Sequence, residues 1–121
     1  MKSINEVFES GNTKIWYVKP EYIQDFMMGS EWVEKKNLTP TIDTINTTHV
    51  LLGSIDNFDL ENIYNQLQGE NWSPKGQARE LIKDLGLCHT SMSMGDIIEI
   101  DFILYMVDSI GFTTLNEEEL R

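Results

Sequence analysis

Apolar residues recur along the chain with two different periods, and the period predicts which segments are helices and which are strands. After Asp59 and again after Pro74 the apolar residues fall at i, i+3, i+4 and i+7, which is the spacing of one helix face. Asp59 can cap the first helix, and Ser73 followed by Pro74 is a strong helix start. The sequence therefore predicts amphipathic helices over residues 59–68 and 74–85.

Strands are predicted where β-branched and aromatic residues run together without helical spacing. Two such segments lie in the first half of the chain, and three short ones follow one another near its end. Consecutive short strands separated by turns favour an antiparallel meander. We expect an α+β fold in which a small antiparallel sheet, including this C-terminal meander, packs through one face against the two helices. The predicted strands are residues 14–18, 49–55, 97–100, 103–107 and 111–115.

The remaining segments carry weaker signals. Residues 3–11 have capping-box spacing and predict a short N-terminal helix. Pro20 and Gly29 bracket a helical spacing of apolar residues, and Ser30 can cap a further short helix. Residues 38–48 are rich in threonine and are interpreted as a loop.

Size and composition indicate one domain. The chain has 121 residues, of which 40% are hydrophobic, and this is enough for one core. No linker-like composition divides the chain, so we expect a single domain over residues 1–121 with a flexible acidic tail over residues 116–121. A single cysteine excludes an intramolecular disulfide, and the first residues lack the apolar run of a signal peptide. We therefore expect a cytoplasmic protein, in the host cell cytosol.

The charge is unevenly distributed. Asp and Glu total 20 and Lys and Arg total 9, which gives a formal net charge of -11. Residues 37–74 contain five acidic and no basic residues, and residues 84–120 contain eight acidic and no basic residues. Because phosphates are bound by cations, this charge disfavours nucleic acid or an anionic membrane as a direct partner. Two interpretations stay open: an acidic surface that keeps the protein soluble, or a docking face for a basic protein.

Few residues could perform nucleophilic or acid–base chemistry. Cys88 and His89 are adjacent and would point to opposite faces of an extended segment, so they cannot pair with each other. We interpret Cys88 as a buried structural residue. His89 could order the hydroxyl-rich turn that follows it by binding a backbone carbonyl or Asp108, or it could act as acid or base with Asp96 or Asp108. No metal-binding spacing or phosphate-binding glycine loop occurs, so no metal and no cofactor are expected.

A basic partner protein would meet acidic and aromatic side chains. Glu99 and Asp101 are expected on the solvated face of their strand, because Ile98 and Ile100 alternate with them and face the core. Trp72 lies in a polar loop, where it either packs over the start of the following helix or is exposed as an interface anchor. The candidate partner-binding residues are Trp72, Glu70, Glu99, Asp101, Phe102 and Asp108.

Asp101 and Phe102 stand where the hairpin between residues 97–100 and 103–107 turns. A two-residue hairpin turn needs positive φ angles, which phenylalanine tolerates poorly. We therefore expect a tip longer than two residues, with Phe102 exposed.

A hydroxyl-rich turn, a Gly-Asp pair, a hydrophobic hairpin and an Asp-x-x-Gly-Phe segment follow one another between His89 and Phe112. In this order they resemble the YodL-like domains of polyvalent proteins from phages and conjugative elements. The resemblance covers about a fifth of the chain. It implies a mobile-element protein that acts against host defence, and it implies this context without a mechanism, because no activity is established for the family. The block from Gln68 to Gly76 is also similar to small uncharacterised phage and plasmid proteins. The residues that carry the main resemblance are His89, Ser91, Ser93, Gly95, Asp96, Gly111 and Phe112.

Three functions of different classes are compatible with these patterns. The first is a non-enzymatic counter-defence protein of a phage or mobile element, which binds and blocks a basic, nucleic-acid-handling host protein such as a CRISPR effector by partly mimicking the charge of DNA or RNA. The second is a small-ligand or nucleotide-binding module, in which Lys75, Arg79 and Lys83 would form one cationic helix stripe. The third is a small hydrolase that uses His89 and the aspartates named above. We take the first as the working hypothesis.

Overall fold

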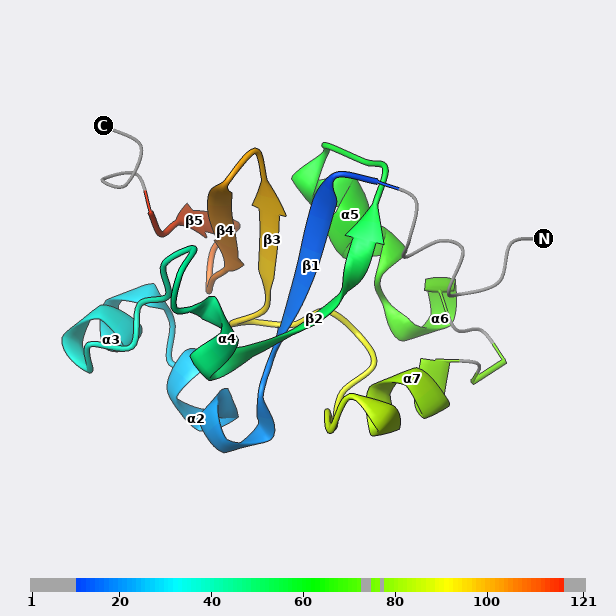
Figure 1. The fold of residues 1–121 in the computed structure, drawn as a ribbon, viewed down its shortest axis with the longest axis horizontal. Helices are drawn as coiled ribbons and strands as arrows, with labels where there is room; N and C mark the ends of the chain where they lie inside the picture. Colours follow the sequence, from blue (N-terminus) through cyan, green and yellow to red (C-terminus); the bar gives the residue numbers. More distant parts are fainter. Residues whose placement is uncertain (1–10, 73–74, 77, 117–121) are drawn as a thin grey trace.

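The computed structural model describes residues 11–72, 75–76 and 78–116, which form one five-stranded sheet and several short helices (Figure 1). The strand order is β2-β1-β3-β4-β5, and each strand is antiparallel to its neighbours. The expected α+β class is therefore observed. The elements in chain order are β1 (Thr13–Val18), the 3-10 turn η1 (Pro20–Tyr22), α2 (Ile23–Phe26), α3 (Ser30–Lys35), α4 (Ile45–Thr48), β2 (His49–Ile55), α5 (Leu60–Gln66), α6 (Gly69–Trp72), α7 (Ala78–Asp84), β3 (Ile97–Ile100), β4 (Ile103–Val107) and β5 (Phe112–Thr114).

All five predicted strands are confirmed, and strands β3 to β5 form the expected C-terminal meander. Strand β1 lies in the sheet between β2 and β3, so the first strand of the chain joins the N-terminal pair to the meander (Figure 1). The predicted helix over residues 3–11 lies outside the described residues except for Gly11. Most of the predicted acidic tail, from residue 117 onward, also lies outside them.

The sheet is covered on both faces, whereas we expected helices on one face only. Alternate residues of β1 belong to two separate core clusters, with Tyr17 in one and Trp16 in the other. The first cluster contains buried residues of α5 and α7, as expected. The second is filled by the connection between β1 and β2, which carries α2, α3 and α4. The buried side chains that these helices and the C-cap of α5 supply are Ile63, Leu67 and Ile82 to the first cluster, and Phe26, Val33 and Ile45 to the second.

Some predicted boundaries were wrong. Part of the predicted loop over residues 38–48 is helical, since α4 occupies its last four residues. Gly69, which directly follows the predicted helix over residues 59–68, begins α6. The cationic stripe is shorter than predicted, because α7 begins at Ala78 and Lys75 precedes it. The predicted start at residues 73–74 lies outside the described residues.

The tip between β3 and β4 is shorter than we expected. Ile100 pairs with Ile103, so only Asp101 and Phe102 form the turn, with φ angles of 50° and 67°. Positive φ at both central residues gives a turn whose twist matches that of the strands. The Asn116 side chain holds this turn, since its amide donates to the carbonyl of Phe102 (2.6 Å). The predicted exposure of Phe102 is confirmed at 65%.

No helix within the described ranges is long and apolar enough to span a bilayer.

Candidate functional site

Asp96 is a fully buried carboxylate at the start of β3. It accepts hydrogen bonds from the backbone amides of Val18 and Ser93, each at 2.9 Å. His89 Nε2 lies 3.1 Å and 2.9 Å from its two oxygens. Burial raises the pKa of Asp96, while the hydrogen bond and charge of His89 and the two amides lower it. The carboxylate therefore joins the end of β1, the turn before β3 and the segment after α7.

The His89 ring is held by a stacking contact and by a hydrogen bond. It stacks on Tyr17 with ring centroids 4.6 Å apart and an interplanar angle of 12°. Its Nε2 atom faces Asp96, and its Nδ1 atom is buried without a hydrogen-bond partner among the described residues. Of the two predicted partners for acid–base chemistry, the fold brings Asp96 to His89, whereas Asp108 bonds to other residues.

His49 lies on the other face of the sheet and supports the same turn. Its Nε2 atom donates to the carbonyl of Gly95 (2.8 Å), and its Nδ1 atom accepts from the hydroxyl of Thr48 (2.7 Å). These bonds satisfy a neutral imidazole. Burial is the main cause that lowers the pKa of His49 to about 4. The bond to Gly95 raises this pKa, whereas the charges of His89 and Lys19 lower it further. The turn before β3 is thus held by an imidazole from each face of the sheet.

This arrangement suits support of the turn better than catalysis. A general base must reach the proton that it removes, and His89 has one ring nitrogen on Asp96 and the other buried. Tyr17 donates its hydroxyl to the carbonyl of Thr90 (2.8 Å), and burial raises its pKa far above the ordinary value. Cys88 is exposed, contrary to our expectation.

The residues that carry the family resemblance occupy turns around this centre. Ser91 accepts a hydrogen bond from the amide of Gly69 (2.6 Å), and Ser93 contributes its amide to Asp96 while its side chain is exposed. Gly95 has φ of 97°, and a Cβ atom there would lie 2.6 Å from Phe26. Glycine is therefore required at this position. Gly111 and Phe112 lie at the far side of the meander, at the start of β5.

Glu99 does not face solvent, so this expectation was wrong. It is only 7% exposed, and its carboxylate accepts a hydrogen bond from the indole of Trp16 (3.0 Å). The alternation along β3 was read correctly, but both faces of the strand are covered. Glu99 therefore cannot contact a partner without a rearrangement of the second core cluster.

Asp108 is bonded within the protein and is also a poor docking group. Its oxygens accept hydrogen bonds from the hydroxyls of Ser30 and Thr113 and from the amides of Ser30 and Ser109. Partial burial raises its pKa, but these hydrogen bonds outweigh that effect and lower the pKa overall. The predicted cap residue Ser30 thus binds Asp108 in place of its own helix.

Trp72 is half-buried at the end of α6, which favours packing over exposure. Its indole donates to the carbonyl of Thr90 (3.1 Å), and its ring packs against the first core cluster. It covers the segment after α7 and is not an exposed anchor. The Glu70 side chain lies outside what the structure describes.

Asp101 and Phe102 are the two predicted partner-binding residues that the fold leaves exposed. Thr13 of β1 pairs with Ile55, and Lys14 pairs with both Ser54 and Glu99. The ends of β2 and β3 are therefore level with each other on either side of β1. Figure 1 shows that the turn after β2 and the turn after β3 lie at the same end of the sheet. Two strand spacings separate the ends, about 10 Å.

At this end of the sheet, two exposed phenyl rings lie among aspartates. Phe58, in the turn after β2, is 59% exposed, against 65% for Phe102. The backbone of the Phe58 turn is tied to β1, because the Thr13 hydroxyl donates to the carbonyl of Asn57 (2.6 Å). We call this region the acidic–aromatic end. It consists of Asp56, Phe58, Asp59, Asp101 and Phe102, all of which are exposed.

Phe58 was missed by sequence reasoning. A signal was present, because a phenylalanine between Asn57 and Asp59 in a polar turn has no helical or strand spacing through which to be buried. What the sequence lacks is the strand order that brings this turn beside the Phe102 turn.

The described cations lie mostly elsewhere. Lys14, on β1, is the one nearest to the acidic–aromatic end in strand register. Lys19 follows the opposite end of β1, and Lys35 and Lys36 lie at the end of α3. Arg79 and Lys83 lie on α7, and Lys75 precedes that helix.

In the part of the chain that the structure describes, no group of three or more His, Cys, Asp or Glu side chains is arranged to hold a metal ion. Comparison of the chain with protein-family models, with curated proteins and with solved structures finds no match.

Proposed function

We propose that this protein is a non-enzymatic binding protein whose acidic–aromatic end docks on a basic, nucleic-acid-handling protein. The observation that carries the proposal is the conformation of Phe102, which combines a φ of 67° with 65% exposure. A non-glycine residue held in this region costs about 1–3 kcal/mol, and such residues cluster at functional sites. Since Phe102 is largely in solvent, core packing does not offset this cost.

The surroundings of Phe102 resemble the usual anatomy of a protein interface. Exposed aromatic rings serve as anchors, and charged groups around them steer the partner and exclude wrong ones. Asp56, Asp59 and Asp101 would provide a negative field that attracts a positively charged surface. Phe58 would provide the second anchor.

The biological setting comes from the resemblance to YodL-like domains. It supports a counter-defence protein of a phage or mobile element, and a CRISPR effector is the kind of basic host protein that would fit. On this proposal the carboxylates occupy positions that phosphates of DNA or RNA would take on the effector.

The two other functions have less support. The predicted hydrolase requires His89 to reach a substrate, and its Nδ1 atom is buried while Nε2 is bonded to Asp96. The predicted nucleotide site requires a stripe of three cations on one helix, and only Arg79 and Lys83 lie on α7.

The proposal is tested by partner capture with paired variants. Tagged wild type would be incubated with lysate of a host that carries intact defence systems, and the retained proteins identified by mass spectrometry. Asp101→Asn and Phe102→Gly should each weaken binding of the purified partner by about tenfold or more, the loss typical of an interface anchor. Glu34→Gln and Met28→Ser are matched controls on exposed sites of α3 and its preceding turn, and Met28 is 61% exposed.

Salt dependence provides the second readout. Screening shortens from about 10 Å at 0.1 M salt to about 3 Å at 1 M, so affinity should fall steeply across this range. Binding that is insensitive to salt, or that the control variants weaken as much as the test variants, would overturn the proposal.

A further inference from the structure

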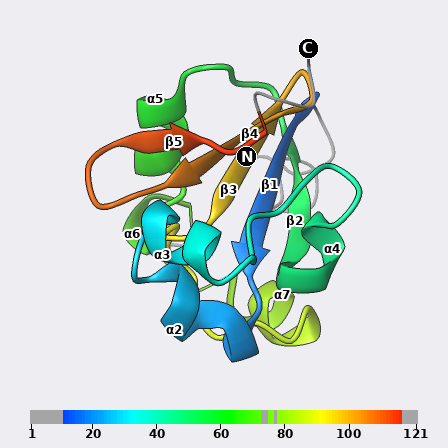
Figure 2. The ribbon, with the colours of Figure 1, turned by 90° about the vertical axis from the view of Figure 1, so that its left-hand side faces the viewer.

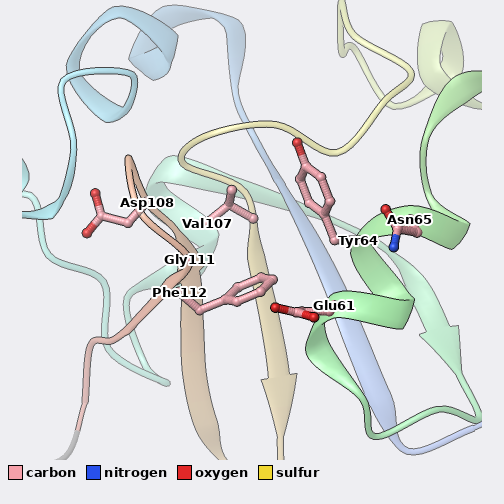
Figure 3. Close-up of a pocket in the computed structure, with 7 residues that line it drawn as sticks. All are labelled: Glu61, Tyr64, Asn65, Val107, Asp108, Gly111 and Phe112. Atoms are coloured by element: carbon pink, nitrogen blue, oxygen red, sulfur yellow. The ribbon is translucent and has the colours of Figure 1, made fainter.

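A cleft of about 330 Å³ lies between α5 and the β4–β5 hairpin (Figure 3). Tyr64 of α5 and Phe112 of β5 form its aromatic walls, with ring centroids 6.5 Å apart and an interplanar angle of 82°. The buried Val107 lines it from β4. Figure 2 shows the β4–β5 hairpin reaching to the side of α5, which is how two distant segments come to enclose one site.

The polar groups around the rings are acidic or neutral. Glu61 and Asn65 line the cleft one turn apart on α5, and both are exposed. In Figure 3 the Glu61 carboxylate lies beside the Phe112 ring. Asp108 lines the hairpin side, and its carboxylate points away from the rings. Among the described residues that line the cleft there is no lysine or arginine, so the two carboxylates are the charged groups of this described lining.

Aromatic faces next to a carboxylate are a binding environment for an organic cation. A guanidinium group fits this environment better than an ammonium group, because it is planar, stacks on rings and donates two parallel hydrogen bonds to one carboxylate. The volume is near the lower limit for ligand clefts, which suits one side chain. A nucleotide is disfavoured, since its phosphates would meet Glu61 and Asp108 without a cation.

We propose that this cleft receives an arginine side chain of the basic partner, with the guanidinium against Tyr64 and Phe112 and paired with Glu61. This inference rests on the proposed function and extends it. Glu61 lies in the first turn of α5, two residues after Asp59 of the acidic–aromatic end. The cleft therefore begins within one helical turn of the acidic–aromatic end. Ile110, the most exposed of the large hydrophobic residues in the described part of the chain at 91%, precedes Gly111 on the rim.

The test uses a defined probe in place of the unknown partner. The tripeptide N-acetyl-Gly-Arg-Gly-amide would be titrated into the 15N-labelled protein, and amide shifts followed by NMR. Saturable shifts should map to Glu61, Tyr64, Gly111 and Phe112. The matched tripeptides with citrulline, which keeps the shape without the charge, and with lysine should bind at least fivefold more weakly.

Two glutamates in corresponding positions provide the matched variants. Glu61 and Glu80 are each exposed in the first turn of a helix, so Glu61→Gln and Glu80→Gln remove the same charge. Glu61→Gln should weaken arginine-tripeptide binding fivefold to tenfold, and Glu80→Gln less than twofold. Equal effects of the two variants, shifts that map to other acidic sites, or citrulline or lysine binding as tight as arginine binding would overturn the inference.

The outcome separates this inference from the proposed function. If the tripeptide fails to bind the cleft while Asp101→Asn and Phe102→Gly still reduce partner binding, the arginine site is wrong and the docking proposal stands. If the tripeptide binds the cleft and those two variants leave partner binding unchanged, the acidic–aromatic end is not the docking surface.

Discussion

Two turns that each contain an aspartate flank the four residues of β3, and the fold uses them in opposite ways. In the turn before β3, Asp96 is buried and its carboxylate accepts hydrogen bonds from two backbone amides and from His89. In the turn after β3, Asp101 and Phe102 are exposed and have positive φ angles. The hydrogen bonds of Asp96 stabilise the first turn. In the second turn, the positive φ angle of Phe102 lowers stability, and the exposed side chain gains no core packing that would offset this cost.

The strand register explains why the two aspartates differ. Strand β3 begins at Ile97, opposite Trp16, so β1 extends two residues farther and the amide of Val18 has no strand partner on that side. Asp96 accepts from this amide at 2.9 Å. Asp101 lies beyond the opposite end of β3, where β1 has only just begun. A carboxylate stabilises the fold where it lies next to a backbone amide that has no strand partner. Where no such amide is near, the carboxylate stays exposed and available to bind another molecule.

The largest expected difference between the turns is in stability. Asp96→Asn places an amide group against the backbone N–H donors that the carboxylate satisfies, so it should lower the free energy of unfolding by about 3 kcal/mol. The same replacement at Asp101 should change it by less than about 0.5 kcal/mol. Urea unfolding followed by tryptophan fluorescence measures both. Similar values for the two variants would contradict the structural assignment of the first turn.

The second difference is in pH dependence, because His49 bonds the turn before β3. With a folded pKa of about 4 against about 6.5 when unfolded, the unfolded state binds more protons in this range. The stabilisation is fully present above pH 6.5 and is lost as the pH falls towards 4, by roughly 3 kcal/mol. Comparison of the wild type with His49→Gln by urea unfolding across this range isolates the contribution.

Asp96 acts in the opposite direction, since burial raises its pKa and its contribution is lost as pH rises through the folded value. Asp108 has a lowered pKa and acts only in more acidic solution, below its ordinary range. Asp96 and Asp108 are present in both the wild type and His49→Gln. The difference in the free energy of unfolding between these two proteins should therefore show the pH dependence that His49 causes. NMR titration of the His49 ring gives an independent check. A ring that becomes charged near pH 6 would contradict the predicted window.

A smaller effect than those at Asp96 and His49 is expected at Phe102, and it has the opposite sign. Glycine adopts positive φ without strain and is preferred in this type of turn, so Phe102→Gly should raise the free energy of unfolding by about 1 kcal/mol. The same variant is expected to weaken partner binding. If Phe102→Gly is both less stable and less able to bind, the phenyl ring contributes to folding, and this would contradict its assignment to the docking surface alone.

Local patterns predicted the strands and the α5 helix correctly. Helical spacing after Asp59 and runs of β-branched residues are properties of neighbouring residues, and Asp59 caps α5 by accepting from the amide of Asn62 as expected. The predictions that failed at the candidate site depended on what covers each surface. Glu99 alternates correctly along β3, yet the segment between β1 and β2 covers its face. Trp72 and Asp108 likewise found hydrogen-bond partners far along the chain.

The sequence by itself determined the α+β class, the five strands, the exposure of Phe102 and the excess of negative charge, because each depends on composition or on residues close in the chain. Only the tertiary structure decided which carboxylates are buried and that the Phe58 and Phe102 turns share one end of the sheet. It also decided that Tyr64 and Phe112 enclose a cleft beside Glu61. The physical reason is that burial and juxtaposition depend on strand order and on long-range packing, which no local pattern of residues encodes.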